Sequence, residues 1–582
     1  MRLKTPRAET GFLLLVATGL MLASYPRIHL GLLNLVSHNL AAWEARSDTI
    51  SVILLGYGVL LLGMALLSYL LWLRDRSFLA EALSQGRGAL RELKHSLHDP
   101  LRDSPLTRSD AIFLLAIVMI GLVARAYFLA QPMRFDEAYT FIDFVQQSFS
   151  QSFYYLAPNN HVLHTLLVKI TTWLWGASPA ALRLPALASG MVAIPLAFLL
   201  SRKLHRGRAG LLAAIGMAVT PYLILYGTMA RGYTLLVCLT IALALVGARF
   251  VAEPGLPGCM LISLFAALGM LTIPTMLYAI AGLYLWIALI ITVKGGVARA
   301  LTGFVVPCAV LTGAFTFIAY TPVMLMSGGL AAITSNRFVM PAPWDDFLNG
   351  ILPHFISVFG DFLRDVSGPT LLGLFALMLV GIFAAARKRQ WATLLLFACV
   401  LLGSGTVFLV QHRIPFARTW IYLIPFALVL ADGGFATVLG KLGRRLQGWL
   451  ITAVIVLGGS FAITLMTGNT IATYADTGAF PEAAAVARYL KPVIASSDRV
   501  SVRPLADMPS RYYFWYYGLP FKAGTASDAG GNHYVIVKTN QFDICDVANG
   551  PVRLLFELDH AQVFRYVLPG EKISPTRVCR IM

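Results

Sequence analysis

The chain has 582 residues, of which 58% are hydrophobic and 13% are charged. Soluble proteins carry about 25% charged residues, so this composition excludes an ordinary soluble enzyme and predicts a protein that crosses a membrane several times. The formal net charge of +18 does not predict a nucleic-acid partner, because the basic residues cluster between apolar segments, as they do on the cytoplasmic side of membrane proteins. This distribution predicts membrane lipid as a partner.

Long stretches without charge recur along the chain and mark the predicted membrane spans. About 20 apolar residues cross a bilayer as a helix, so the longest stretches hold two helices or a helix with a loop. The basic clusters fall on one side when the N-terminus is cytoplasmic and about thirteen helices are counted, which puts the C-terminus outside. The uncharged stretches are 10–26, 49–73, 111–123, 209–230, 232–248, 254–293, 300–336, 366–386, 390–412 and 446–475.

Residues 1–110 are predicted to form an N-terminal extension of two spans and a cytoplasmic amphipathic segment. The first span has a basic start, but no small-residue cleavage site follows it, so a span is favoured over a signal peptide. Leucines at roughly helical spacing after the second span predict a helix on the membrane surface. These are Leu79, Leu83, Leu90, Leu93 and Leu97.

Residues 111–467 are predicted to form the membrane core, with about eleven spans and two long external loops, 131–180 and 324–368. The first loop opens with two adjacent carboxylates, Asp136 and Glu137, directly after an apolar helix. Carboxylates at the end of a span are costly to remove from water and often mark a functional site. A positioned carboxylate is also a proton acceptor. The pair is therefore the leading candidate for catalysis, with a solvated helix end as the alternative.

Other polar side chains of the first loop are candidates for binding a sugar or an acceptor. Arg134 and Tyr139 flank the acidic pair, and Asn160 and His161 follow in an otherwise apolar setting. Asn and His side chains can hold a hydroxyl-rich ligand, and they can equally cap the start of a helix. Both interpretations stay open at this point.

Three arginines occur near the predicted outer ends of spans, namely Arg231, Arg413 and Arg418. Each can extend its guanidinium to the lipid headgroups or neutralise a phosphate at the membrane surface. Combined with the acidic pair, the second alternative predicts a lipid phosphate held between a carboxylate base and arginines.

The sequence identifies no cofactor. It contains no His-x-x-x-His, no paired Cys-x-x-Cys and no nucleotide-binding glycine loop. Asp345 and Asp346 form an isolated acidic cluster, the one place where the sequence leaves a divalent metal open.

Residues 468–582 have no run long enough to span a membrane and are predicted to form a small α/β domain on the outer face. A helix is expected over 481–490, with strands over 499–502, 534–537, 552–556 and 563–567. Cys545 and Cys579 are candidates for a disulfide if this domain is exported. The aromatic run 512–517 suits acceptor recognition, core packing or seating on the membrane.

Five short segments in order resemble the GT-C superfamily, the membrane glycosyltransferases that use polyprenyl-phosphate sugars. Within it, the protein O-mannosyltransferases, the ArnT aminoarabinose transferases and the rhizobial lipopolysaccharide sugar transferases are the most similar. The resemblance covers residues 111–467 and implies a GT-C-like transmembrane catalytic core. The segments are 135–139, Asn160–His161, 178–185, 230–233 and Arg418.

The resemblance also implies roles for individual residues. Asp136 matches the acid of the first loop, which acts as base or organises the acceptor, and Glu137 matches its neighbour. Arg231 and Arg418 match positions near the carrier phosphate. Many relatives carry His-Pro-Pro or Lys-Pro-Pro in this loop, whereas His161 is followed here by valine and leucine.

These observations predict an inverting glycosyltransferase at the outer face of the inner (plasma) membrane. It would move a hexose or pentose from a polyprenyl-phosphate carrier to a hydroxyl of an exported glycan, lipid or protein. A flippase or transporter for lipid-linked sugars is the alternative of another class, and a glycan polymerase or ligase is a third. Transporters usually show inverted repeats and midplane charges, and the sequence shows neither.

Overall fold

The computed structural model describes residues 16–20, 47–74, 88–155, 158–205, 209–329, 340–476, 478–522, 531–539, 541–546, 548, 550–567 and 576–579. Most of the first predicted span and the start of the predicted amphipathic segment, with Leu79 and Leu83, lie outside these residues. The rest of that segment is helix α6 (Gly88–Asp103), and the second predicted span is α4 (Ser47–Arg74).

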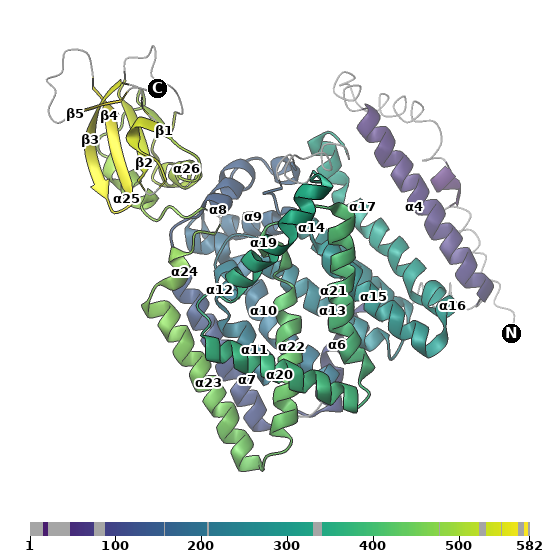
Figure 1. Ribbon diagram of the computed structural model, residues 1–582. Helices are drawn as coiled ribbons and strands as arrows, with labels where there is room; N and C mark the ends of the chain where they lie inside the picture. The colour runs from purple at the N-terminus through teal and green to yellow at the C-terminus, as the bar shows by residue number, and fades with distance from the viewer. Residues whose placement is uncertain are drawn as a thin grey trace.

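A bundle of apolar helices makes up most of the molecule (Figure 1). Eight helical segments in the described residues are long and apolar enough to cross a membrane: α7 (Arg108–Phe128), α10 (Pro179–His205), α13 (Tyr233–Phe250), α15 (Met276–Gly295), the run α16–η4–α17 (Val297–Ser327), α20 (Gly368–Arg387), α21 (Trp391–Gln411) and α23 (Arg444–Thr467). Shorter apolar helices include α9 (Val162–Trp175), α14 (Leu256–Thr272) and α22 (Leu423–Leu439). The prediction of a polytopic helical membrane protein is confirmed, whereas the count of about thirteen spans stays a prediction.

Glycines let several of these helices approach closely. A Cβ on Gly434 of α22 would lie 1.9 Å from the carbonyl oxygen of Leu377 in α20, and one on Gly381 would lie 2.4 Å from that of Leu430. Gly282 of α15 and Gly403 of α21 meet in the same way. Such backbone contact gives membrane helices the close packing that the hydrophobic effect does not supply within lipid.

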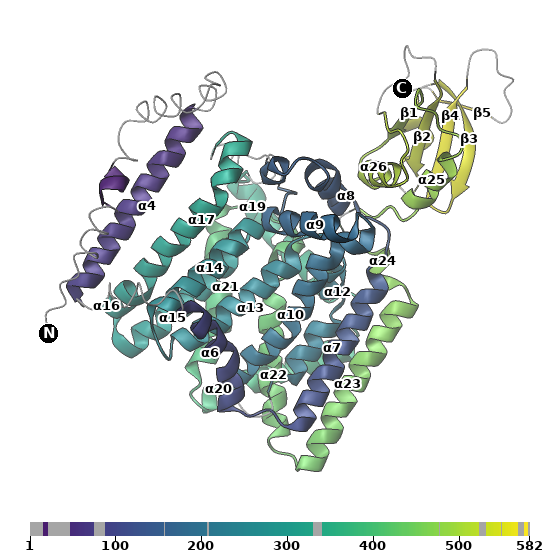
Figure 2. The same ribbon diagram turned by 180° about the vertical axis from the view of Figure 1, so that it is seen from behind.

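The first predicted external loop folds into short helices across one end of the bundle, called the loop-one end below. They are α8 (Phe135–Thr140), the π-helix η2 (Phe141–Val145), the 3-10 helix η3 (Ser150–Phe153) and α9. Figure 2 shows α9 lying across the ends of the longer helices. Trp173 and Trp175 of α9 are exposed, as expected for a helix at a membrane surface. The second predicted loop contains α19 (Trp344–Phe362).

Short elements complete the bundle. They are α11 (Leu211–Val219), α12 (Pro221–Gly227), η6 (Ala417–Trp420) and α24 (Thr470–Thr473). Helix α12 starts at a proline, which has no backbone N–H to leave unpaired. The opposite end of the bundle, where α10 and α20 end and α23 begins, is called the basic end because of its Lys and Arg residues.

The C-terminal residues form a five-stranded sheet with strand order β1-β2-β4-β3-β5. The strands β1 (Arg499–Val502) and β2 (His533–Lys538) are parallel, and β3 (Gly550–Leu558), β4 (Ala561–Tyr566) and β5 (Thr576–Cys579) join in antiparallel fashion. The helices are α25 (Ala483–Leu490) and α26 (Asp507–Tyr516), with a 3-10 turn η7 (Ile544–Asp546). The small sheet domain is thus confirmed, and the boundaries at 110 and 467 stay predictions.

Helix α26 carries most of the aromatic run 512–517 and docks this domain on loop one. The Phe141 ring lies 4.7 Å from the ring of Trp515 and 5.3 Å from that of Tyr512. The hydroxyl of Tyr513 accepts a hydrogen bond from the backbone N–H of Met133 at 3.1 Å. The aromatic run therefore serves packing, one of the three uses predicted for it.

Candidate active site

Asp136 lies in the first turn of α8 and forms an ion pair with Arg418 of η6. Arg418 Nη2 is 3.4 Å from Asp136 Oδ2, and the two side chains are 16% and 14% exposed. The buried Oδ2 atom accepts no hydrogen bond from any described residue. A carboxylate oxygen with unused acceptor capacity can take a proton from a ligand.

Glu137, its neighbour, is fully buried, and both oxygens of its carboxylate accept hydrogen bonds. It forms a buried ion pair with Arg183 of α10, whose Nε lies 3.0 Å from Glu137 Oε2. The backbone N–H groups of Arg134 and Ala230 each donate to it at 2.9 Å. These contacts link α8, α10 and the turn before α13. They favour a positioning role for Glu137 rather than the catalytic role predicted from its place beside Asp136.

Arg231 sits in the turn before α13 and is 2% exposed. Its Nη1 donates to the hydroxyl of Thr140 at 2.9 Å and to the carbonyl of Asn159 at 2.5 Å. Its Nη2 lies 3.0 Å from His161 Nε2, while the backbone nitrogen of Gly232 lies 2.9 Å from His161 Nδ1. Both neighbours of this imidazole are donors, and a neutral imidazole accepts at one nitrogen only. Only one of the two contacts is therefore a hydrogen bond.

Burial and the nearby positive charges of Arg231 and Arg418 lower the pKa of His161 well below its usual value. The imidazole is therefore neutral at pH 7. It adds no charge to a site that already holds two guanidinium groups.

Tyrosines line the space between the two arginines. Arg418 Nε donates to the hydroxyl of Tyr233 at 2.8 Å, and the Tyr233 ring contacts the rings of His161 and Tyr226. Several buried polar atoms here have no hydrogen-bond partner among the described residues: Asp136 Oδ2, Arg231 Nε, Tyr226 Oη and both ring nitrogens of His164. Buried polar groups are normally paired, so a cluster of unpaired ones suits a polar ligand.

Arg134 and Asn160, predicted to contact a sugar or an acceptor, are both engaged with the backbone. Arg134 donates to the carbonyls of Tyr474 and Ile471 at 2.5 and 2.7 Å, which ties loop one to α24 and to the residue directly after it. Asn160 donates to the carbonyls of Ser152 and Tyr154, both at 2.9 Å. These bonds shape the loop, so the ligand roles of the two residues stay predictions.

The remaining predicted residues lie apart from the arginine pair. Among the described residues, no hydrogen bond or ion pair joins Arg413 to Asp136. Tyr139 lines a cavity of about 520 Å³ one helical turn beyond Asp136. Asp345 and Asp346 are exposed in the first turn of α19, where carboxylates stabilise a helix N-terminus. No group of three or more His, Cys, Asp or Glu residues in the described ranges is placed to hold a metal.

Cys545 takes part in a disulfide bond. The side chain of Cys579, its predicted partner, lies outside the described residues. The backbone of Cys579 pairs with Gly550 at the start of β3.

Arg183, Tyr233 and Tyr226 were not predicted as site residues, whereas His164 was expected beside His161 as a further polar group of loop one. Arg183 interrupts an apolar helix, and a lone arginine in a membrane helix is by itself a signal of a buried partner. His164 follows His161 by three residues, which places it on the same face of α9. The tyrosines carry no comparable signal, because aromatic residues are common in membrane helices.

Comparison with known proteins finds similarity in sequence and in fold. The family model described as dolichyl-phosphate-mannose-protein mannosyltransferase matches residues 159–326. The crystal structure of ArnT from Cupriavidus metallidurans bound to undecaprenyl phosphate has a TM-score of 0.52 at 13% identity, over 79% of this chain and 98% of that one. Its apo state gives a TM-score of 0.51 at 14% identity, over 78% and 97%. No curated protein sequence matches the chain.

The fold is therefore that of the GT-C membrane glycosyltransferases, as the sequence segments predicted. The family model covers α9 to α17, the part that holds His161, His164, Arg183 and Arg231. Asp136 precedes the matched region and Arg418 follows it, so the site joins matched and unmatched parts of the chain.

Proposed function

We propose that this protein is an inverting glycosyltransferase that moves a sugar from a polyprenyl monophosphate to a hydroxyl of an exported acceptor. The observation that carries the proposal is the ion pair of Asp136 with Arg418 beside Arg231. It brings a carboxylate oxygen that accepts no hydrogen bond together with two guanidinium groups, at the end of a helical bundle of GT-C fold.

The proposed reaction is a single displacement at the anomeric carbon. Asp136 accepts the proton of the acceptor hydroxyl as its oxygen bonds to that carbon, and the bond from the carbon to the phosphate oxygen breaks. The polyprenyl phosphate leaves as an anion, so it requires positive charge more than a general acid. Arg231 and Arg418, buried or nearly so, supply that charge where water screens it little. One displacement inverts the configuration at the anomeric carbon.

Two observations support a lipid-linked donor. The similar ArnT structure is bound to undecaprenyl phosphate. The description of the matching family model names dolichyl-phosphate mannose. The site also lies at the end of apolar helices, where a carrier can keep its chain in lipid while its phosphate reaches the arginines. The sugar itself, hexose or pentose, stays undefined.

We assign the acceptor to the cavity beside α8. It is lined by two tyrosine rings, Tyr139 and Tyr154, and by the polar side chains of Asp143, Gln147 and Gln151. Aromatic faces with amide and carboxylate groups between them suit a ring with many hydroxyls. This lining favours a glycan portion of the acceptor over an apolar one.

The outer face is the proposed location of the site. The basic end carries the Lys and Arg residues that the positive-inside rule puts in the cytoplasm, and loop one lies at the other end. The disulfide of Cys545 is of a kind that persists in oxidising compartments.

A reconstituted assay separates transfer from transport. Vesicles containing the full-length protein receive a polyprenyl monophosphate carrying a radiolabelled sugar, together with a glycolipid acceptor. Label appearing on the acceptor, with a matching release of polyprenyl phosphate, supports the transferase. Label that changes leaflet while staying on its carrier would instead identify a flippase.

A further inference from the structure

Helix α19, in the second predicted loop, packs on η6, the short helix that carries Arg418. Trp420 of η6 is 3% exposed, and its indole Nε1 donates a hydrogen bond to Nε2 of His354 at 2.8 Å. His354 lies in the middle of α19 and is 8% exposed. Among the described residues, this is the one side-chain hydrogen bond between α19 and η6. It joins the second predicted loop to a helix of the candidate active site.

The chemistry of the two partners fixes the direction of this bond. An indole N–H only donates, so His354 must accept through an unprotonated Nε2. Burial lowers the pKa of His354, which keeps the ring neutral at pH 7 and leaves that lone pair available. A buried donor without a partner is costly, so the bond keeps Trp420 oriented toward α19.

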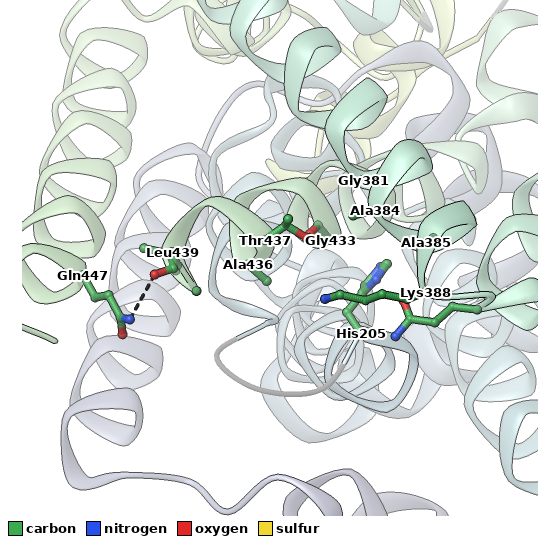
Figure 3. A pocket seen from close by; sticks show the side chains of 12 residues that line it. His205, Gly381, Ala384, Ala385, Lys388, Gly433, Ala436, Thr437, Leu439 and Gln447 are labelled. Atoms are coloured by element: carbon green, nitrogen blue, oxygen red, sulfur yellow. Dashed lines mark hydrogen bonds between the residues drawn. The ribbon is translucent and has the colours of Figure 1, made fainter. Parts of the chain in front are cut away.

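A histidine at the basic end of the bundle has the opposite role in its hydrogen bond. Figure 3 shows His205 and Lys388 in the lining of a cavity of about 360 Å³ at that end. The Nε2 atom of His205 lies 3.1 Å from the carbonyl of Val429, which can only accept, so His205 donates. That bond is remote from the proposed reacting groups, whereas the bond of His354 holds a helix that carries one of them.

Helix η6 directs Arg418 and Trp420 to different neighbours. A 3-10 helix turns once in about three residues, so side chains two positions apart point in different directions. Arg418 Nε donates to the hydroxyl of Tyr233 at 2.8 Å, and its Nη2 lies 3.4 Å from Asp136. The ring of Trp420 packs instead on Phe355 of α19. A movement of η6 that frees Trp420 would therefore displace Arg418 as well.

Helix α19 is fixed near both of its ends, so it can hold η6 in place. Just before the helix, the backbone N–H of Ala342 donates to the carbonyl of His412 at 3.0 Å. Just after it, Arg364 Nη1 donates to Asp476 Oδ2 at 3.2 Å, in the segment that follows α24. His354 lies between these two attachments and is therefore a fixed acceptor.

We propose that His354 is a positioning residue for the donor phosphate, because it holds Trp420 and thereby the guanidinium of Arg418. This inference rests on the proposed function, in which Arg418 binds the phosphate of the lipid-linked donor. His354 itself touches no reacting group. With the bond in place, η6 is held between α19 and α8, and Arg418 is oriented beside Asp136 before the donor binds. Such preorganisation lowers the cost of binding.

Initial rates of transfer by the full-length protein in vesicles test this role, with a polyprenyl monophosphate carrying a radiolabelled sugar and a glycolipid acceptor. His354→Phe removes the hydrogen-bond acceptor and Trp420→Phe removes the donor. Each should raise the KM for the lipid-linked donor about fivefold, the effect of one hydrogen bond, and leave the KM for the glycolipid unchanged. Because both changes break the same bond, the double variant should be no worse than the more affected single variant. His354→Gln, whose amide oxygen can accept the indole N–H, should restore most of the donor KM.

His412→Asn is the matched control. The ring of His412 also packs on α19, 4.9 Å from the ring of Trp344, but no described hydrogen bond joins it to η6. Asparagine tolerates the left-handed backbone of this residue, which has a φ of 33°. Both KM values should therefore stay unchanged in His412→Asn.

Three results would overturn the role of His354 in a protein whose wild type is active. A lower kcat with an unchanged donor KM in His354→Phe is the signature of lost folded enzyme alone. Additive effects in the double variant would mean that the two side chains act separately. Failure of His354→Gln to restore the donor KM would exclude the hydrogen bond as the cause. A wild type that transfers no sugar from the polyprenyl monophosphate would overturn the proposed function itself, and this role with it.

Discussion

At the loop-one end, Asp136 pairs with Arg418 and Glu137 with Arg183, whereas at the basic end Lys388 faces a cavity that no carboxylate lines. Ion pairs at the first end satisfy side chains that are largely removed from water. At the second end no Asp or Glu lines the cavity that Lys388 borders. The two ends therefore differ in whether the chain supplies a carboxylate for its buried or lining cation.

The two adjacent carboxylates, Asp136 and Glu137, also differ in how fully their oxygens are hydrogen-bonded. Glu137 is saturated by an arginine and two backbone N–H groups. Asp136, one residue earlier, keeps an oxygen without a hydrogen bond. The contacts of Glu137 contribute to the fold, whereas Asp136 keeps the acceptor capacity that the proposed reaction requires.

Asp136→Asn tests whether the carboxylate of Asp136 acts as the base. An amide cannot accept the acceptor proton, so we expect kcat to fall by about 10²–10⁴-fold while thermal unfolding is unchanged. Initial rates of transfer from the labelled donor measure this. Asp346→Asn, an exposed carboxylate on α19, is the control and should keep full activity. Near-normal transfer by Asp136→Asn would remove Asp136 as the base.

Glu137→Gln tests whether the buried ion pair of Glu137 with Arg183 stabilises the fold. It leaves the buried guanidinium of Arg183 without its countercharge, which should lower the free energy of unfolding by about 3–5 kcal/mol. Denaturation of the detergent-solubilised protein measures the change. Glu253→Gln removes a partly exposed partner of Arg249 and should cost at most about 1 kcal/mol. A stable but inactive Glu137→Gln protein would contradict the positioning role.

Arg418→Lys tests whether Arg418, rather than Arg413, contacts the donor phosphate. Lysine keeps the positive charge but cannot contact both Asp136 and the Tyr233 hydroxyl in the same planar geometry. We expect kcat/KM for the lipid-linked donor to fall about 10–100-fold. Arg413→Lys is the comparison, because no described contact joins Arg413 to Asp136, and its effect should be small. The reverse order would exchange the roles of these arginines.

The pH dependence of stability gives the smallest effect. His161 has a lowered pKa in the folded protein, whereas an unfolded histidine titrates near 6.5. As the pH falls below that value, the unfolded state binds a proton that the folded state does not, so stability falls. The expected loss is about 1 kcal/mol from pH 6.5 to 5.5, seen as a lower Tm. His161→Asn should lessen this slope, and an unchanged slope would show that other groups cause it.

The amino-acid sequence by itself determined the membrane-spanning character, the sheet domain after residue 468 and the position of the acidic pair. Helix α25 and strands β1 to β4 lie where the spacing of apolar and turn residues predicts them. Hydropathy and periodicity are properties of neighbouring residues, so they can be read without knowing what packs on them.

Only the tertiary structure decided what each polar residue does. Glu137 meets Arg183 from 46 positions away, and Arg134 is occupied by carbonyls near residue 474. Asp136 is joined to Arg418 only because η6 and α8 meet at the same end of the bundle. The partner of a buried charge depends on which helices pack together, and that follows from contacts between distant parts of the chain that local composition does not encode.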